Sequence, residues 1–589
     1  MLIEEIIARS DGVPLFVEEL TKAVLDLHTP DAGAVPLTLR DSLMARLDRL
    51  GPPKEIAQIA SVLGRQFTFE ALKAVAATND SDLHAALAKL REAGLVYELE
   101  RNCDDGLSFN HSLVQEAAYD SLPRGRRRIL HSQVARYLEA QSAAAGDPTL
   151  IAYHFGRAAE PAKSVHYWLE AADQASRRVA LAESAANLGA ALDEAERISD
   201  PQLRKRLMLD AQLKLSATIA IHKGPHSDEA QSSLEKAEAL ARETGEGAKL
   251  FQAVWGLYLN AARNRRYSKA KQRGDELLRI SRDLNDRDLQ YEALHHQWGY
   301  AYFIGRTADI LSLTAEGVRN YNRARHHRFS YVYAGHDPGV CAHCVRALGL
   351  GLAGHGREVR PTLNTGLALA NDLEHPLTLA FFHSVACFAM YLADDADGCQ
   401  EFAEELIKVS TKYDLAATRA VGSFVTGASL GLRGDVTAAL KQMEPSFEPT
   451  LTYGFMGVLP GVIMIEMLNR VGRSQEALAL AIRLLDDLPD PEAAVFVSEL
   501  WRLRGELRLV ADSDKSAQAL TDVKIALRIA ENQGAAVYRL RAAVSAARLF
   551  AETGERERAK SILDQVKNLA TARSGPDMAA ATRLRSDLN

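Results

Sequence analysis

The sequence has few aromatic residues, few cysteines and no excess of positive charge. Only 6% of its 589 residues are Phe, Trp or Tyr, and five cysteines are too few, and odd in number, for a disulfide framework. The net charge of −7 excludes a global basic field that would draw the chain to nucleic acid. The chain starts with MLIEEIIARSDG, which is acidic and amphipathic and lacks the pattern of a signal peptide. Together these features predict a protein of the reducing cytoplasm.

Long apolar runs are also missing. The best membrane candidate, Leu451–Ile465, is too short to span a bilayer, contains Pro460 and stops at Glu466. We therefore expect a buried helix there and no contact with a membrane. Alanine and leucine dominate the composition, which favours closely packed helices.

The sequence lacks the motifs of an ATPase, a cyclase or a serine hydrolase. A phosphate-binding loop needs G-x-x-x-x-G-K-[ST], and the nearest stretch, Gly299 to Thr307, has the wrong spacing and no lysine. We find no convincing pair of metal-binding carboxylates at a strand–turn and no G-x-S-x-G. We therefore expect no enzymatic activity, no catalytic residue and no cofactor.

What the chain does contain is organised around Leu107–Glu139. Phe109 ends a short alternating run, which is a strand signal. The apolar positions from His111 to Leu122 then follow the spacing of a helix, and a basic run from Arg124 to Arg128 opens the next one. We interpret this stretch as the hinge between a small N-terminal module and a long helical array.

Residues 32–122 predict a winged-helix domain. Four short helices are followed by a hairpin, Leu95–Glu100 with Leu107–Phe109, around a polar turn. Many such domains bind DNA, but the hairpin is acidic at Glu98 and Glu100, and its turn adds Asp104 and Asp105. DNA phosphates would be repelled, so we expect a spacer and keep DNA binding as the alternative.

Residues 123–589 predict an α-solenoid of TPR-like hairpins, which makes the chain all-α. A turn residue followed five positions later by a small or apolar residue recurs at intervals of about 40 residues. Such hairpins bury their apolar faces only against their neighbours, and their surface binds protein or small-molecule partners. The turn residues are Arg265, Gly305, Gly354, Asp394, Gly434, Gly472, Asp512 and Gly554.

One interval between successive turn residues, from Gly305 to Gly354, is longer than the others and contains an unusual segment, Arg323–Val340. Insertions in solenoids map to loops that often bind partners, and arginine and tyrosine together engage acidic or aromatic groups. The alternative is an irregular bend with the tyrosines packed on the next repeat. The predicted partner-binding residues are Arg323, Arg325, Arg328, Tyr331 and Tyr333.

The same region contains Cys341-Ala342-His343-Cys344, close to His336. A structural zinc site needs four converging ligands, usually two such pairs, and only one pair is present. The adjacent histidines 295 and 296 point apart on a helix. We therefore expect buried helical cysteines and no metal site.

Several of these blocks resemble one bacterial family, the signal-transduction ATPases with numerous domains (STAND), many of which are fused to class III adenylate/guanylate cyclases. The blocks are Phe109–Leu122 with the arginine run and His131, the tyrosine-rich stretch ending G-H-D-P-G-V-C, and Glu499–Leu507. Gly12-Val13-Pro14 resembles the G-x-P motif of the ATPase lid, where the proline packs near adenine.

The resemblance implies a regulatory or sensor region of such an ATPase. Residues 1–31 would be a remnant of the helical lid, with Gly12 and Pro14 as adenine-side contacts only when an ATPase core is present. The implied function is non-catalytic signal transduction through protein–protein interaction, with an ATPase or cyclase module upstream or in trans. The alternative is a related ATPase–TPR transcriptional regulator that binds DNA through the winged helix.

Overall fold

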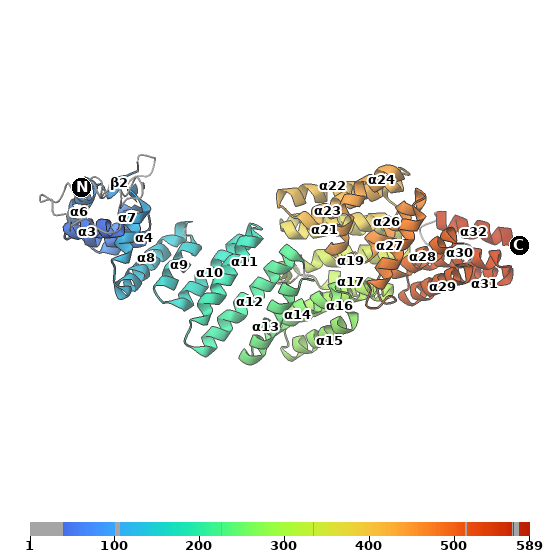
Figure 1. Ribbon diagram of the computed structural model, residues 1–589. Coiled ribbons are helices and arrows are strands. Elements are labelled where there is room, and N and C mark those ends of the chain that lie inside the picture. The colour runs from blue at the N-terminus through green and yellow to red at the C-terminus, as the bar shows by residue number, and fades with distance from the viewer. Residues whose placement is uncertain are drawn as a thin grey trace. The chain divides into compact units, whose positions relative to one another are not determined.

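The computed structural model describes residues 39–99, 106–145, 147–224, 226–333, 335–512, 515–567, 569 and 576–588. It divides into two compact units, Met1–Leu207 and Met208–Asn589, shown in Figure 1. The boundary falls inside one helix, α12 (Pro201–Lys223). The expected lid, with Gly12 and Pro14, lies outside the described residues.

Unit 1 opens with short helices around a three-stranded antiparallel sheet of order β1-β3-β2. The expected hairpin is β2 with β3, in which Val96 pairs with Phe109. Strand β1, which the sequence analysis did not predict, pairs Phe67 with Leu107. The elements are α3 (Leu39–Arg49), α4 (Pro53–Leu63), β1 (Gln66–Thr68), α5 (Phe69–Ala76), α6 (Asp80–Glu92), β2 (Val96–Glu98), β3 (Gly106–Phe109) and α7 (Ser112–Asp120).

Side-chain caps fix where the short helices begin. The Thr68 hydroxyl accepts a hydrogen bond from the amide of Ala71 at 3.1 Å, and the Asn79 side chain accepts one from Asp82 at 2.9 Å. Such caps satisfy amides that have no partner within the helix. Under the sheet, the Phe67 and Phe109 rings pack 5.6 Å apart in the core of this part.

The rest of unit 1 is helical and packs in sequence order. Each helix contacts the next along the chain. Pro148 and Pro161 sit at helix starts, where a missing amide hydrogen is harmless. The helices are α8 (Arg124–Ala145), α9 (Pro148–Arg157), α10 (Pro161–Arg177) and α11 (Leu181–Glu196).

Unit 2 consists of antiparallel helical hairpins (Figure 1), which confirms the predicted all-α solenoid. After α13 (Asp228–Thr244), the hairpins are α14/α15 (Gly247–Arg263, Tyr267–Asp283), α16/α17 (Arg287–Phe303, Thr307–Asn320), α19/α20 (Pro338–Ala353, Gly356–Leu373), α21/α22 (Pro376–Leu392, Ala396–Lys412), α23/α24 (Ala416–Leu432, Val436–Met443), α26/α27 (Leu459–Arg470, Ser474–Asp486), α28/α29 (Val497–Ala511, Ser516–Gln533) and α30/α31 (Ala536–Glu552, Arg556–Val566). Short elements interrupt the series, namely α18 (Arg323–His326), η1 (His327–Tyr331), η2 (Glu444–Ser446) and α25 (Phe447–Tyr453), and α32 (Pro576–Leu588) follows it.

The repeated turn residues seen in the sequence connect the two helices of each hairpin. All of them except Asp512 have positive φ, from 59° at Arg265 to 98° at Gly434. Glycine adopts this left-handed conformation without steric cost, and aspartate tolerates it better than most residues, as at Asp394. The period of about 40 residues is therefore the spacing of left-handed turns.

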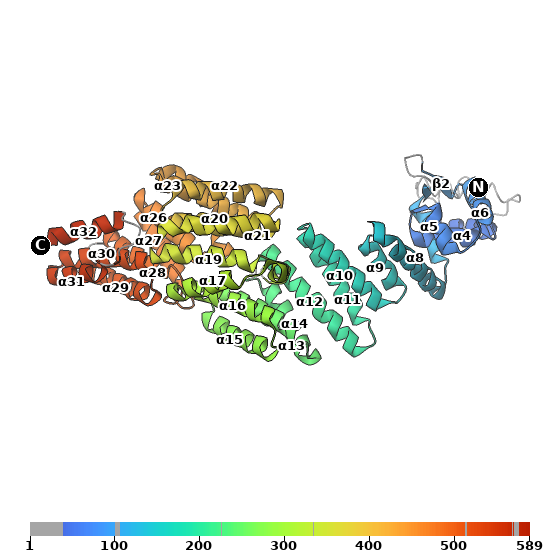
Figure 2. The same ribbon diagram turned by 180° about the vertical axis from the view of Figure 1, so that it is seen from behind.

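Unit 2 also closes on itself through contacts between distant hairpins. The hydroxyl of Tyr302 donates to the carbonyl of Phe455 at 3.2 Å, and the amide of Val495 donates to the carbonyl of Phe303 at 2.9 Å. Helix α19, which lies between α17 and α21 (Figure 2), also contacts α30. One continuous hydrophobic core therefore runs from Phe251 to Tyr538.

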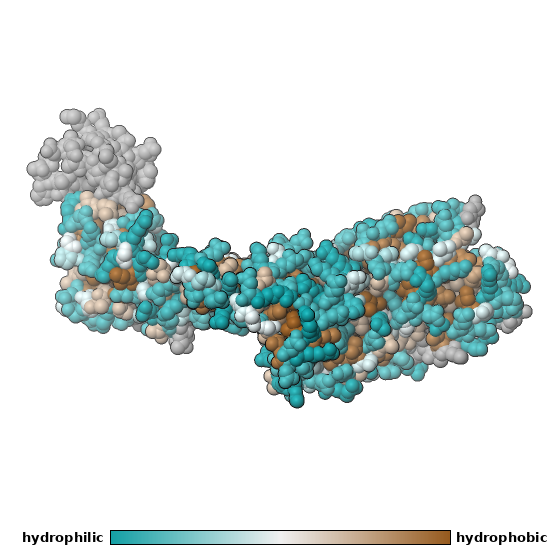
Figure 3. All heavy atoms as spheres, turned by 90° about the horizontal axis from the view of Figure 1, so that it is seen from below, coloured by the Kyte–Doolittle hydropathy of each residue, from teal (hydrophilic) through white to brown (hydrophobic). Residues whose placement is uncertain are grey.

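On the face drawn in Figure 3, apolar residues lie in patches among hydrophilic ones. Within the part of the chain that the structure describes, no helix combines the length and the apolar character that crossing a bilayer requires. This agrees with the buried position of α26, which holds much of the apolar run noted above.

The close approach of α28 and α29 gives the first prediction. A Cβ at Gly505 would lie 2.9 Å from the carbonyl oxygen of Ala519 and 2.9 Å from Val523, closer than real contacts allow. We expect Gly505→Ala to lower the free energy of unfolding of unit 2 by about 1–3 kcal/mol, measured by chemical denaturation.

The matched control is Gly189→Ala in α11, where a Cβ meets nothing within 4 Å. Removing a helical glycine there should stabilise unit 1 by up to about 1 kcal/mol. Equal and stabilising effects at both positions would contradict the close packing of α28 on α29.

Candidate functional site

The stretch Leu107–Glu139 forms most of β3, all of α7 and most of α8. His111 caps α7, because its Nδ1 accepts a hydrogen bond from the amide of Leu113 at 3.2 Å. Val114, Ala117 and Ala118 are buried in the same core as the sheet. The spacing of the apolar residues in this stretch is therefore explained by packing between the sheet and the first long helix.

Two buried histidines follow in this block. Nε2 of His131 lies 2.9 Å from the Tyr119 hydroxyl, and its Nδ1 lies 2.8 Å from Nδ1 of His154. Burial, together with the nearby His154 and the guanidinium groups of Arg157 and Arg127, lowers the pKa of His131 to about 3. Burial lowers the pKa of His154 to about 4. Both rings are therefore neutral at neutral pH.

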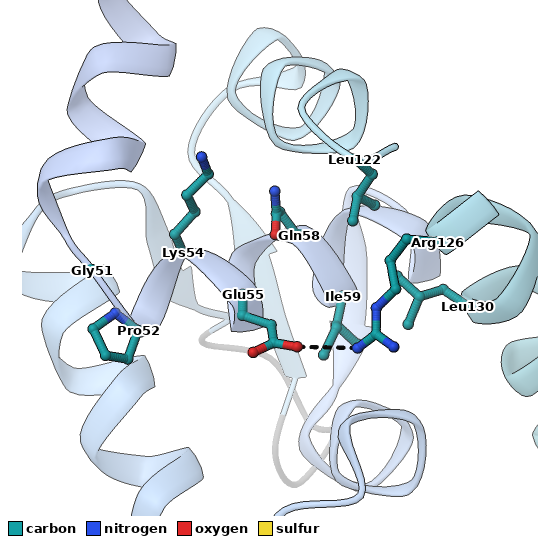
Figure 4. A pocket seen from close by; sticks show the side chains of 9 residues that line it. All are labelled: Gly51, Pro52, Lys54, Glu55, Gln58, Ile59, Leu122, Arg126 and Leu130. Carbon is teal, nitrogen blue, oxygen red and sulfur yellow. Dashed lines mark hydrogen bonds and ion pairs between the residues drawn. The ribbon is translucent and has the colours of Figure 1, made fainter. Parts of the chain in front are cut away.

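The arginine run borders a pocket of about 370 Å³ between α4 and α8 (Figure 4). Arg126 reaches across it to Glu55, with 3.0 Å between Nη2 and Oε1, and Lys54 pairs with Asp48. Gln58 donates to Ser121 at 2.8 Å. Since these charges neutralise one another, the pocket has no strong preference for an anion or a cation.

The predicted partner segment forms α18 and η1, on the surface of unit 2. Arg325 and Arg328 both pair with Asp288 of α16, the latter at 2.9 Å, and Arg323 pairs with Asp372 of α20. The three arginine side chains remain 51%, 65% and 52% exposed. They are therefore available to a partner, although each already has an anionic neighbour.

The two tyrosines of the segment differ. Tyr331 is 61% exposed, with its ring against His375 at 4.8 Å. Tyr333 is only 4% exposed and packs between Trp255, at 5.3 Å, and Phe251, at 5.9 Å. This corrects the prediction of Tyr333 as a partner-binding residue, because its side chain anchors the segment to the core. The anchor is α14 (Gly247–Arg263) of an earlier hairpin, whereas the alternative of an irregular bend placed the tyrosines on the next repeat.

Asp337 connects the segment to α19. Its Oδ1 accepts the amides of Gly339 and Val340 at 2.8 and 3.1 Å, which caps the helix. Its Oδ2 accepts the Tyr321 hydroxyl at 3.0 Å and lies 3.1 Å from His327 Nδ1. A Cβ at Gly339 would lie 2.6 Å from the Tyr321 ring, so only glycine fits there. The G-H-D-P-G-V-C stretch is thus a buried helix start.

Below this helix start, the structure brings together three residues that the sequence analysis did not combine. Nitrogen atoms of His295 and His336 and the sulfur of Cys341 lie within 4.8 Å of one another, and all three residues are buried. Cys344 and His343 are not part of this group. His296 points elsewhere, toward Tyr258, as expected for adjacent helical positions.

Glu292 completes this cluster from one turn earlier on α16. Its Oε1 lies 2.8 Å from His295 Nδ1, and the carboxylate is 0% exposed. Burial raises the pKa of Glu292, while His295 opposes this. Burial disfavours the charged form of His295, but Glu292 and Cys341 raise its pKa to about 10. The cluster is thus an acid–base pair beside a thiol.

The third family-like block, Glu499–Leu507, forms a buried ionic network. Arg502 binds Glu499 with two hydrogen bonds, of 2.7 and 2.9 Å, and Arg541 of α30 also reaches Glu499 at 2.9 Å. Arg541 further pairs with Glu466 of α26 at 3.4 Å and Asp577 of α32 at 3.0 Å. Burial alone would raise the pKa of Glu499, but Arg502 and Arg541 hold it well below its usual range.

No protein-family model matches the chain. An uncharacterised protein of Rhizobium meliloti (strain 1021) is 24% identical over 548 residues, which cover 90% of this chain and 53% of that protein. The chain therefore spans about half the length of this curated relative.

Two solved structures resemble the fold at low scores. A STAND protein with a tetratricopeptide repeat sensor from Pyrococcus horikoshii has a TM-score of 0.30 and 10% identity, covering 99% of this chain and 71% of that chain. The APC/C hetero-tetramer Cut9–Hcn1 has a TM-score of 0.41 and 12% identity, covering 78% and 92%. Neither likeness assigns a function to a residue of this chain.

The ionic network predicts a large effect for one arginine. Arg541→Met would remove a cationic partner from the fully buried carboxylate of Glu499 and from the partly exposed carboxylate of Glu466, so we expect unit 2 to lose about 3–5 kcal/mol in free energy of unfolding. Arg528→Met, which removes an exposed pair with Glu492, should cost less than about 1 kcal/mol. Similar losses in the two variants by urea denaturation would refute the structural role of Arg541.

The buried histidine pair predicts a pH dependence in unit 1. Both histidines have lower pKa values folded than unfolded, so the unfolded chain binds more protons below pH 6.5. The stability of unit 1 should therefore be full above about pH 6.5 and fall by about 1.4 kcal/mol per histidine for each pH unit below it.

The measurement compares free energies of unfolding at pH 7.5 and 5.5 for the wild type and for a His131→Gln/His154→Gln double variant. The difference between the two pH values should shrink in the double variant, whatever its absolute stability. His166→Gln, at an exposed position of α10, is the control variant that removes a histidine outside the pair. An undiminished difference in the double variant would show that the pair does not titrate on unfolding.

Proposed function

We propose that this chain is a non-catalytic regulatory or sensor region of a STAND-type signalling ATPase, and that it binds a protein partner through the surface of its helical repeats. The observation that carries the proposal is the segment α18–η1, which interrupts the series of hairpins and presents three exposed arginines beside the exposed Tyr331. Insertions at such positions often serve binding.

The finer points of the proposal rest on the sequence resemblance. The order helix–helix–strand–helix–helix–strand–strand in residues 39–109 supports a winged-helix module, here acting as a spacer ahead of the repeats. The three family-like blocks support a link to an ATPase, and through it to a cyclase, upstream or in trans. The activity of such a larger protein belongs to this proposal and not to the chain alone.

The alternative, DNA binding through the winged helix, receives no support from the charges. Arg91 of α6 pairs with Glu98 of β2. The pair neutralises a basic group on the helix that would face DNA, and phosphate contacts are the main source of such affinity. A protein partner therefore fits the charges of the described residues better than DNA.

The test replaces the exposed arginines. Arg325→Ala/Arg328→Ala should change the free energy of unfolding by no more than about 1 kcal/mol. Both arginine side chains are largely exposed, and ion pairs of exposed arginines contribute little to stability. A photo-crosslinking residue at the exposed position 331 would identify the partner in cells. The double variant should then reduce that crosslink at least tenfold.

A matched control uses Arg473→Ala/Arg528→Ala, two exposed arginines that also pair with glutamates. The control should retain the crosslink. Equal crosslinking by both double variants would show that the partner binds elsewhere, and unfolding of Arg325→Ala/Arg328→Ala would show that the segment is only structural.

A further inference from the structure

The strongest unexplained feature of unit 2 is the cluster of Glu292 and His295 on α16 with His336 and Cys341 at the start of α19. The exposed fractions of the four residues are 0%, 5%, 6% and 3%. Polar groups of this kind are rare in a core unless hydrogen bonds or a metal ion compensate their burial.

Hydrogen bonds within the protein do not fully compensate the cluster. Oε2 of Glu292 is buried and accepts no hydrogen bond from the residues that the structure describes. A buried carboxylate oxygen without a partner carries a large desolvation cost. A positive charge close to it would remove much of that cost.

We propose that this cluster binds one divalent cation of borderline softness, of which Zn²⁺ is the first choice, with His295, His336 and Cys341 as its ligands. Imidazole nitrogen and thiolate sulfur are the donors that Zn²⁺ prefers, whereas Mg²⁺ and Ca²⁺ prefer oxygen. The proposal differs from the expectation drawn from the sequence, because His295 comes from a helix outside the cysteine motif.

The geometry fits such an ion after small side-chain movements. Donors bound to Zn²⁺ lie roughly 3.5 Å apart in a tetrahedral site, and the three donors here lie within 4.8 Å of one another. The three donors must therefore move closer together when the ion binds. The fourth position of a tetrahedral ion would be open to a water molecule.

The surroundings resemble those of known histidine–metal sites. Nδ1 of His295 faces the Glu292 carboxylate at 2.8 Å, which leaves Nε2 for the ion. A carboxylate behind a histidine ligand fixes the ring and strengthens the ligand. The His336 ring lies flat on Phe381, with 3.8 Å between centroids and 5° between planes, and this fixes its orientation.

Charge also favours a divalent ion. With Cys341 as thiolate, Glu292 as carboxylate and both histidines neutral, a divalent cation makes the cluster electrically neutral. The ion would connect α16 to α19 directly below the segment that carries Arg325 and Arg328. A bound ion would thereby stabilise the packing of α16 against α19, the two helices next to the exposed α18–η1 segment.

The test uses the full chain, exhaustively chelated and then titrated with Co²⁺ alone. We expect equimolar binding, a thiolate-to-cobalt charge-transfer band and the d–d bands of tetrahedral cobalt, all removed by added Zn²⁺. Cys341→Ser should abolish the charge-transfer band. Cys344→Ser should keep it, since Cys344 is a buried cysteine of the same helix but lies outside the cluster.

A second measurement covers the case in which Cys341→Ser fails to fold. Chelation should lower the thermal unfolding midpoint of the wild type, and Zn²⁺ should restore it, because a ligand that binds the folded state stabilises it. Absence of the cobalt bands in the wild type, bands of equal strength in both serine variants, or a midpoint indifferent to chelation and Zn²⁺ would each overturn the proposal.

Discussion

The end of helix α16 is the point on which the architecture of unit 2 depends. In three consecutive residues, the hydroxyl of Tyr302 donates to the carbonyl of Phe455, the carbonyl of Phe303 accepts the amide of Val495, and the carbonyl of Ile304 accepts the side chain of Gln533 at 3.4 Å. An open solenoid contacts only its neighbours. These bonds instead hold three later segments against one early helix.

The same helix also carries the groups that define the candidate site. Asp288, in its first turn, holds Arg325 and Arg328, and Glu292 and His295, one and two turns later, lie in the buried cluster. Tyr302, near the C-terminal end of this helix, makes the hydrogen bond to Phe455 that connects two distant parts of unit 2. The surface segment and the buried cluster therefore both contact one helix, α16.

Local patterns in the sequence were sufficient for the helices, but not for the contacts between distant ones. The left-handed turns at Gly305 and Asp394 have a residue-type signal, and so does the hairpin that ends at Phe109. Strand β1 is only three residues long, too short to show alternation. Tyr333 and His295 have no local signal at all, because their burial depends on α14 and α19 packing against them, which only the tertiary structure specifies.

The contacts at α16 also set an order of events during synthesis. Hairpins of neighbouring helices can form as they leave the ribosome. The hydrogen bond between the carbonyl of Ile304 and the side chain of Gln533 cannot form until Gln533, 229 residues later, has been synthesised. At about 5–20 residues per second, this wait is on the order of ten seconds or more. Until then, the carbonyls and apolar surface at the end of α16 lack their final partners, and exposed apolar surface of this kind makes a folding intermediate prone to aggregate.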